Sequence, residues 1–293
     1  MNEKDVKSLF LLLEDPDPKV YEAIRSSIFE HLDEVKPYLE QSWVLSSDIL
    51  YQERIQLIHD EIEAKKYVFQ LQKWAGAENP QLFEALLIVE RALFPEYDTV
   101  ELPDAFRKIR HNIWMELTNS STAIEKIKTM NQVLYNVFCL SKPVENVVKR
   151  EHLCLSHVIS QKTGDPLMQC LLYASLAQNL GMPVFVIALP DLFVLAYKDA
   201  FIAELTFATE KHYDVLFYIY PWEQGALFGR SVIDKYLEEK QLSPAPEFYT
   251  PADNVKTVHT YLAVLRNSFS LGKNTEKQQQ IIRQMMNVLE PRL

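Results

Sequence analysis

The stretch that decides the fold is PLMQCLLYASLAQNLGMPVFVIALPDLFVLAY, residues 166–197. Its first half, residues 166–180, is almost continuously apolar. This run begins at Asp165-Pro166, which supplies an N-cap and a proline at the first helical position, and it ends at Gly181. A helix that is apolar on all sides is buried, so we predict a central core helix here.

Short apolar segments follow the central helix, with turn residues between them. They are rich in β-branched and aromatic side chains, which is typical of strands. We therefore predict a small antiparallel sheet made from residues 184–189, 193–197, 200–205 and 215–220.

The rest of the chain has helical periodicity, with apolar residues recurring on one face of each segment. Near the N-terminus, Asp17 is a predicted N-cap, Pro18 the first helical residue, and an apolar stripe runs on to Leu32. The fold class predicted from all segments together is α+β, with a small sheet set between helical regions. The other predicted helices span residues 5–13, 48–74, 81–94, 104–117, 122–138, 231–240, 253–269 and 275–289.

The composition is that of an acidic globular protein. The chain has 293 residues, 48% of them hydrophobic, with 30 Lys+Arg against 40 Asp+Glu and a formal net charge of −10. General nucleic-acid binding is disfavoured, because such proteins carry a basic surface. The 6 glycines form no phosphate-binding motif. We expect no cofactor.

The three cysteines and the N-terminus suggest a cytoplasmic protein. Cys139, Cys154 and Cys170 are odd in number and form no close pair, which fits free thiols in a reducing compartment. The first residues lack the long apolar stretch of a signal peptide. The most apolar region, residues 167–197, is interrupted by polar residues and prolines, so we expect no membrane span.

Five motifs occur in order between residue 81 and about residue 238, and together they resemble the transglutaminase-like superfamily. Within it, the helical first half is similar to the SirB-type bacterial branch. We expect three regions: residues 1–75, helical with a HEAT-like pair; 76–240, which the resemblance makes a papain/transglutaminase-like core with a helical first half; and 241–293, a linker and a helical hairpin that resembles a TPR-like pair. The motifs are LFEALLIVERALFPEYD, MNQVLYNVFCL, HLCLSHVISQKTGDP, LLYASLAQNLGMPVFVIALPDLFVLAY and IYPWEQGALFG.

Active members of this superfamily use a Cys–His–Asp triad, with the cysteine at a helix N-terminus. The resemblance places Pro166 at the cysteine position, Leu192 at the histidine position and Tyr220 at the aspartate position. The SirB-type branch commonly has proline at the first position but usually keeps the other two. All three roles are vacant here, so we predict that the site no longer performs thiol acyl transfer.

An alternative is a relocated catalytic pair. Cys170 lies one turn after Pro166 on the same helix face, and His212 or His157 could act as its base. A buried core cysteine is the simpler interpretation of Cys170. His152 and His157 flank Cys154, but no second His/Cys pair completes a zinc site, so we expect no bound metal.

An aromatic cluster surrounds the vacant aspartate position. Tyr218, Tyr220 and Trp222 would share one face of a strand, and they are candidates for a binding surface as well as for the core. We favour a catalytically vacant binding or scaffolding module whose partner is a protein. The alternatives are an acyl-transfer enzyme or peptidase with a relocated Cys–His pair, and a purely structural surface in a larger assembly. Neither the partner nor the oligomeric state follows from the sequence.

Overall fold

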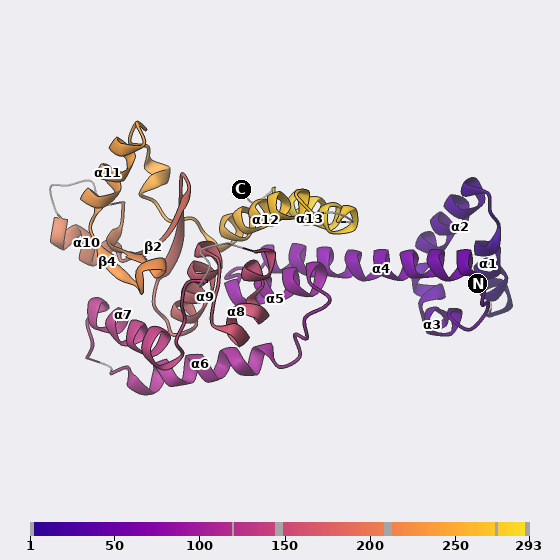
Figure 1. The fold of residues 1–293 in the computed structure, drawn as a ribbon, viewed down its shortest axis with the longest axis horizontal. Helices are drawn as coiled ribbons and strands as arrows, with labels where there is room; N and C mark the ends of the chain where they lie inside the picture. The colour runs from indigo at the N-terminus through magenta and orange to yellow at the C-terminus, as the bar shows by residue number, and fades with distance from the viewer. Residues whose placement is uncertain (1–2, 119, 144–148, 208–212, 273–274, 291–293) are drawn as a thin grey trace. The chain divides into compact units, whose positions relative to one another are not determined.

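The computed structural model describes residues 3–118, 120–143, 149–207, 213–272 and 275–290 (Figure 1). The chain divides into two compact units, Met1–Lys66 and Tyr67–Leu293. The division falls inside one long helix, α4 (Ile49–Ala75). None of the helices in the described ranges combines the length and the apolar character needed to cross a membrane.

The described secondary-structure elements of the first unit are all helices. As predicted, the Asp17 side chain accepts a hydrogen bond from the Lys19 N–H, and Pro18 is the first residue of its helix. The apolar stripe, however, does not run on to Leu32 in one helix. The first helix ends before His31, and Leu32 begins the next helix. Besides the start of α4, the unit contains α1 (Glu3–Leu11), η1 (Leu12–Glu14), α2 (Pro18–Glu30) and α3 (Leu32–Ser42).

The second unit is built around α9 (Pro166–Asn179), which is the predicted core helix. The Asp165 side chain accepts a hydrogen bond from Leu167 N–H at 2.7 Å and so caps the helix, while every residue from 167 to 177 is buried. Around it lie α5 (Leu82–Leu93), α6 (Leu102–Glu116), α7 (Ala123–Asn131), the π-helical turn η2 (Gln132–Val137), η3 (Arg150–Leu153) and α8 (Leu155–Gln161).

The described strands form one antiparallel sheet in the order β1-β2-β3-β4. The strands are β1 (Val184–Leu189), β2 (Leu192–Lys198), β3 (Val215–Tyr220) and β4 (Ala226–Phe228). Three of them confirm the predicted segments. β4 was not predicted, because three residues carry too little pattern to reveal a strand.

The predicted strand at residues 200–205 was wrong. These residues belong to the helix α10 (Ala200–Phe207). The reason is local: the Asp199 carboxylate accepts a hydrogen bond from the Ile202 N–H at 3.0 Å and caps the helix. Periodicity alone does not distinguish a short apolar helix from a strand, and the capping residue was the signal that decided it.

The C-terminal part of the chain adds two helices that lie beside α5 (Figure 1). The Tyr261 hydroxyl, on the first of them, donates to the carbonyl oxygen of Leu153 at 2.7 Å, which ties the hairpin to the core. The fold is therefore α+β, as predicted. The remaining elements are η4 (Pro221–Glu223), α11 (Arg230–Glu239), η5 (Pro246–Phe248), α12 (Asn254–Ser270) and α13 (Glu276–Leu289).

Candidate functional site

The three positions that the resemblance assigns to the triad lie at the ends of secondary-structure elements. Pro166 is the first residue of α9, Leu192 begins β2 and Tyr220 ends β3. α9 packs against β1, β2 and η4, the short helix that directly follows Tyr220. The Sγ of Cys170 approaches the carbonyl oxygen of Phe193 at 3.5 Å, so α9 and β2 are in direct contact here.

The Cys170 thiol is sealed in the core. Its side chain has 0% exposure. Burial, with a further contribution from the Asp165 carboxylate, raises the pKa of this thiol well above its ordinary value. A nucleophilic cysteine needs the opposite shift and a path to solvent. Cys170 is therefore held as a neutral, inaccessible thiol.

The proposed histidine partners of Cys170 do not reach it in the described part of the chain. His157 lies on α8, where its ring contacts Tyr97 and His152. His212 lies outside the described residues. The structure thus brings no histidine that it describes into hydrogen-bonding distance of the Cys170 sulfur.

Cys154 occupies the N-cap position of α8, a place where a helix can stabilise a thiolate. In this protein a carboxylate, and not a thiolate, supplies the negative charge at the N-terminus of α8. The Glu90 carboxylate accepts hydrogen bonds from Leu155 N–H at 2.7 Å, from Ser156 N–H at 2.9 Å and from the Cys154 thiol at 3.3 Å. Burial and the neighbouring Glu90 charge raise the pKa of Cys154. Cys154 therefore donates a hydrogen bond to Glu90 and remains a thiol, and Glu90 is the buried cap of α8.

One group of possible metal ligands lies next to this cap. Side-chain ligand atoms of Glu151, His152 and His157 all lie within 4.8 Å of one another. However, the Lys149 N–H donates to Nδ1 of His152 at 3.0 Å, which places the proton of a neutral ring on Nε2. Neither nitrogen of His152 then offers a free lone pair. We therefore assign no metal to this group.

His152 is expected to make folding pH-dependent. Burial, and secondarily the charge of His157, lower the pKa of His152 below its ordinary value of about 6.5. The unfolded chain then binds more protons below this pH, so stability is complete above about pH 6.5 and falls as the pH drops through the window below it. The variant His152→Asn keeps an acceptor for Lys149 N–H but does not titrate. The free energy of unfolding, measured in urea, should decrease less between pH 7 and pH 5 in this variant than in the wild type.

The control for this experiment is His111→Asn, since His111 is exposed on α6. This control should keep the full pH dependence of the wild type. Equal losses of stability between pH 7 and pH 5 in the wild type and in His152→Asn would contradict the assignment.

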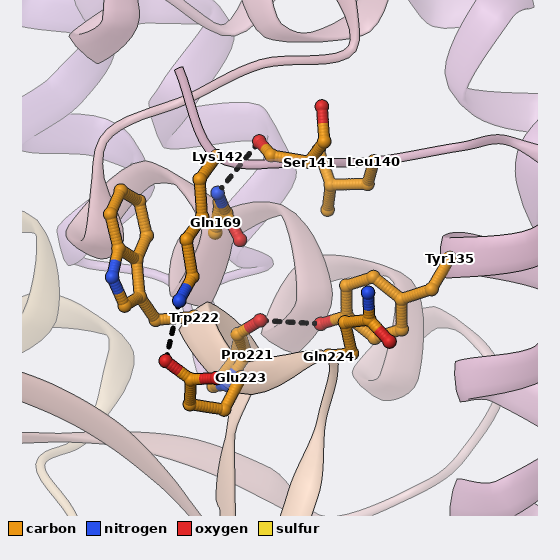
Figure 2. Close-up of a pocket in the computed structure, with 9 residues that line it drawn as sticks. All are labelled: Tyr135, Leu140, Ser141, Lys142, Gln169, Pro221, Trp222, Glu223 and Gln224. Atoms are coloured by element: carbon orange, nitrogen blue, oxygen red, sulfur yellow. Dashed lines mark hydrogen bonds and ion pairs between the residues drawn. The ribbon is translucent and has the colours of Figure 1, made fainter. Parts of the chain in front are cut away.

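A pocket of about 390 Å³ opens beside the end of β3 (Figure 2). This volume is within the range of small-ligand sites, and the pocket draws on segments far apart in the chain. Its walls come from η2, from the loop after it, from α9 and from η4. The lining residues are Tyr135, Leu140, Ser141, Lys142, Gln169, Pro221, Trp222, Glu223 and Gln224.

The η4 wall of the pocket is held in an unusual backbone shape. Gln224 and Gly225 both have positive φ, 52° and 71°, and the Gly225 N–H donates to the Tyr220 carbonyl at 3.0 Å. The Asn131 side chain links this turn to α9. Its Nδ2 donates to the Gly225 carbonyl at 2.8 Å, and its Oδ1 accepts from the Tyr173 hydroxyl at 2.7 Å. The wall is therefore built from a specific contact between α7, α9 and the turn.

Tyr135 is presented by the π-helical turn η2, a conformation that is frequent at functional sites. Its hydroxyl donates to the Pro221 carbonyl at 3.1 Å, as Figure 2 shows. Burial raises the pKa of Tyr135, so the hydroxyl keeps its proton. It joins two walls of the pocket.

Gln169 is the buried polar group of the pocket, with 1% exposure. Its amide nitrogen donates to two carbonyl oxygens, those of Ser141 and Gly164, each at 3.1 Å. Two carbonyl acceptors at one end of the amide fix which end is nitrogen. Figure 2 shows the amide oxygen turned away from Ser141, between Lys142 and Tyr135.

A model of the transglutaminase-like superfamily matches residues 101–263, which is more than half of the chain. The chain belongs to this superfamily. The matched segment of this transglutaminase-like protein contains α9, the whole sheet and all of the pocket residues. A comparison with curated proteins and a comparison with solved structures each found no significant match.

The aromatic residues singled out in the sequence have different places in this transglutaminase-like unit. Trp222 lines the pocket, where the Lys142 ammonium lies 5.4 Å from its ring centroid. Tyr220 is half-buried against the core. Tyr218 is 2% exposed, and its hydroxyl donates to the Tyr249 carbonyl, so in this structure it is a core residue and offers no binding surface.

Sequence reasoning missed Tyr135, Lys142 and Gln169. The signal for Gln169 was present, because it is a polar residue inside an otherwise apolar helix. Tyr135 gave no signal, since a π-helical turn has no sequence pattern that we could use. Lys142 meets Glu223 across 81 residues of sequence, a separation that periodicity does not reach.

Proposed function

We propose that this transglutaminase-like protein is catalytically vacant and that it binds a protein partner through the pocket beside the end of β3. The proposal includes the SirB-type relationship implied by the sequence motifs. It also includes a cytoplasmic location, which is supported by Cys139, Cys154 and Cys170 all being free thiols.

The chemistry of the three triad positions supports the vacancy. Pro166 has no nucleophile and no N–H to donate to an oxyanion. The Leu192 side chain has no group that could accept and return a proton, as the histidine of a triad does. Burial, and next the Glu223 carboxylate, raise the pKa of Tyr220, so this side chain is neutral and supplies no charge to stabilise an imidazolium.

The observation that carries the binding role is the pocket itself. It lies next to the position that the resemblance assigns to the aspartate, and its walls are fixed by the Asn131, Tyr135 and Gln169 hydrogen bonds. A preformed pocket binds with little loss of conformational entropy. Trp222 provides an aromatic contact of the kind that anchors protein interfaces.

Two measurements on the full chain test this function. The first is turnover of glutamine-containing peptides, by ammonia release and by amine incorporation; we expect no rate above that of Cys170→Ala. The second is binding to an array of short peptides of varied charge and apolarity. We expect a set of bound peptides that is lost in Trp222→Ala.

The matched control for the array is Trp114→Ala, because Trp114 is 60% exposed on α6 and does not line the pocket. This control should retain the same peptides. Turnover that Cys170→Ala abolishes would overturn the vacancy. An array on which no binding depends on Trp222 would overturn the binding role.

A further inference from the structure

Three polar side chains of the pocket, those of Gln169, Tyr135 and Ser141, donate their hydrogen bonds to other parts of the protein. Both N–H groups of Gln169 are donated to the Ser141 and Gly164 carbonyls. The Tyr135 hydroxyl proton goes to the Pro221 carbonyl. The Ser141 hydroxyl proton goes to the Lys162 carbonyl at 3.3 Å. What these side chains can still offer to a ligand is their oxygen lone pairs.

The Gln169 oxygen belongs to the only buried residue of the three. Across the described residues, the Gln169 side chain makes only the two hydrogen bonds of its nitrogen, and no described group donates to its Oε1. Oε1 is not among the buried polar atoms that lack a partner, so it opens to the pocket, where a donor from a ligand can take the place of water. A ligand group that can only accept hydrogen bonds would be repelled by the lone pairs of Oε1.

The rim of the pocket carries an ion pair whose carboxylate a ligand can use. The Glu223 carboxylate is paired with Lys142, but both side chains are largely exposed, at 57% and 38%. Exposed ion pairs contribute little free energy, so a ligand cation can replace Lys142 at Glu223. The formal net charge of −10 favours the approach of a cation as well.

We propose that this pocket binds the guanidinium group of an arginine side chain presented by a protein partner. The inference rests on the proposed binding function and specifies its ligand. A guanidinium has five N–H donors in one plane, which suits acceptors on several walls: Gln169 Oε1, the Tyr135 hydroxyl oxygen and Glu223. It is less strongly hydrated than an ammonium and stacks on aromatic rings such as Trp222.

The test uses the full chain labelled with 5-fluorotryptophan, in which the 4 tryptophans give separate ¹⁹F signals. Trp222→Phe assigns the pocket signal, and the others serve as internal controls. The probes are N-acetyl-arginine methylamide and its lysine and citrulline counterparts. We expect the arginine probe to shift the Trp222 signal, with an affinity about tenfold or more above that of citrulline, which lacks the charge.

Variants at the rim distinguish binding at this site from a general effect of the protein's negative charge, and they leave the core intact. Glu223→Gln should weaken binding of the arginine probe by about tenfold, whereas Glu238→Gln, at an exposed position on α11, should leave it unchanged. Lys142→Met removes the competing cation and should tighten binding by about threefold, a gain that misfolding does not produce.

Equal affinities for the arginine and citrulline probes would overturn the guanidinium assignment, as would equal weakening by Glu223→Gln and Glu238→Gln. If array peptides without arginine bind in a Trp222-dependent way and the arginine probe does not, the assignment fails while the binding function stands. If neither peptides nor probes perturb Trp222, the proposed function itself fails.

Discussion

Glu90→Ala is expected to lower the free energy of unfolding of the second unit by about 3 kcal/mol or more. The Glu90 carboxylate is fully buried and accepts from Leu155 N–H, Ser156 N–H and the Cys154 thiol. Its removal leaves these donors in the core without partners, and each unsatisfied buried donor costs about 1–3 kcal/mol. The α8 helix also loses the negative charge at its N-terminus.

Urea unfolding of the full chain, followed by circular dichroism and by fluorescence, measures this loss. Two probes are needed because the two compact units can unfold in separate transitions. Glu84→Ala is the matched control, because it removes an exposed glutamate from the same helix, α5. The control should change stability by no more than about 0.5 kcal/mol. A loss in Glu90→Ala no larger than in the control would show that Glu90 is not the cap.

Gly225→Ala is expected to cost about 3 kcal/mol and to disrupt the pocket wall. A Cβ at this position would overlap the side chain of Asn131, which would have to leave. Its hydrogen bonds to the Gly225 carbonyl and the Tyr173 hydroxyl would then be lost, at about 1 kcal/mol each. The positive φ of 71° adds about 1 kcal/mol of backbone strain for alanine.

Gly181→Ala provides a control for the backbone strain alone. Gly181 has a φ of 72°, but nothing lies within 4 Å of a Cβ built there. Its substitution should cost about 1 kcal/mol, so the difference between the two variants measures the Asn131 contact. The Trp222 ¹⁹F signal should move in Gly225→Ala and stay in place in Gly181→Ala. Equal costs and unchanged Trp222 signals would contradict the described wall.

The parts of the fold that the sequence predicted are those with local signals. Asp165 and Pro166 mark the start of α9, and β1 and β3 lie at the residues predicted from their apolar runs. The strand predicted at residues 200–205 was wrong because an apolar run is ambiguous until Asp199 is recognised as a cap.

The candidate site was harder to predict, because its contacts join distant segments. Asn131 meets Gly225 across 94 residues, and Glu90 meets Leu155 across 65. Hydrophobic periodicity reports which face of an element is buried but not which element covers it. The sequence thus located Trp222 as a candidate, while the acceptors of the pocket emerged only from the structure.

The measurement that tests the catalytic vacancy most directly is alkylation of the native full chain over a range of pH, with each cysteine followed by mass spectrometry. Cys139 is exposed and should react in the native protein. Cys170 should react only as fast as the protein unfolds, at every pH. The contrary result is fast native-state alkylation of Cys170 that persists well below the ordinary thiol pKa of about 8.5, because such a rate requires an accessible and activated thiolate.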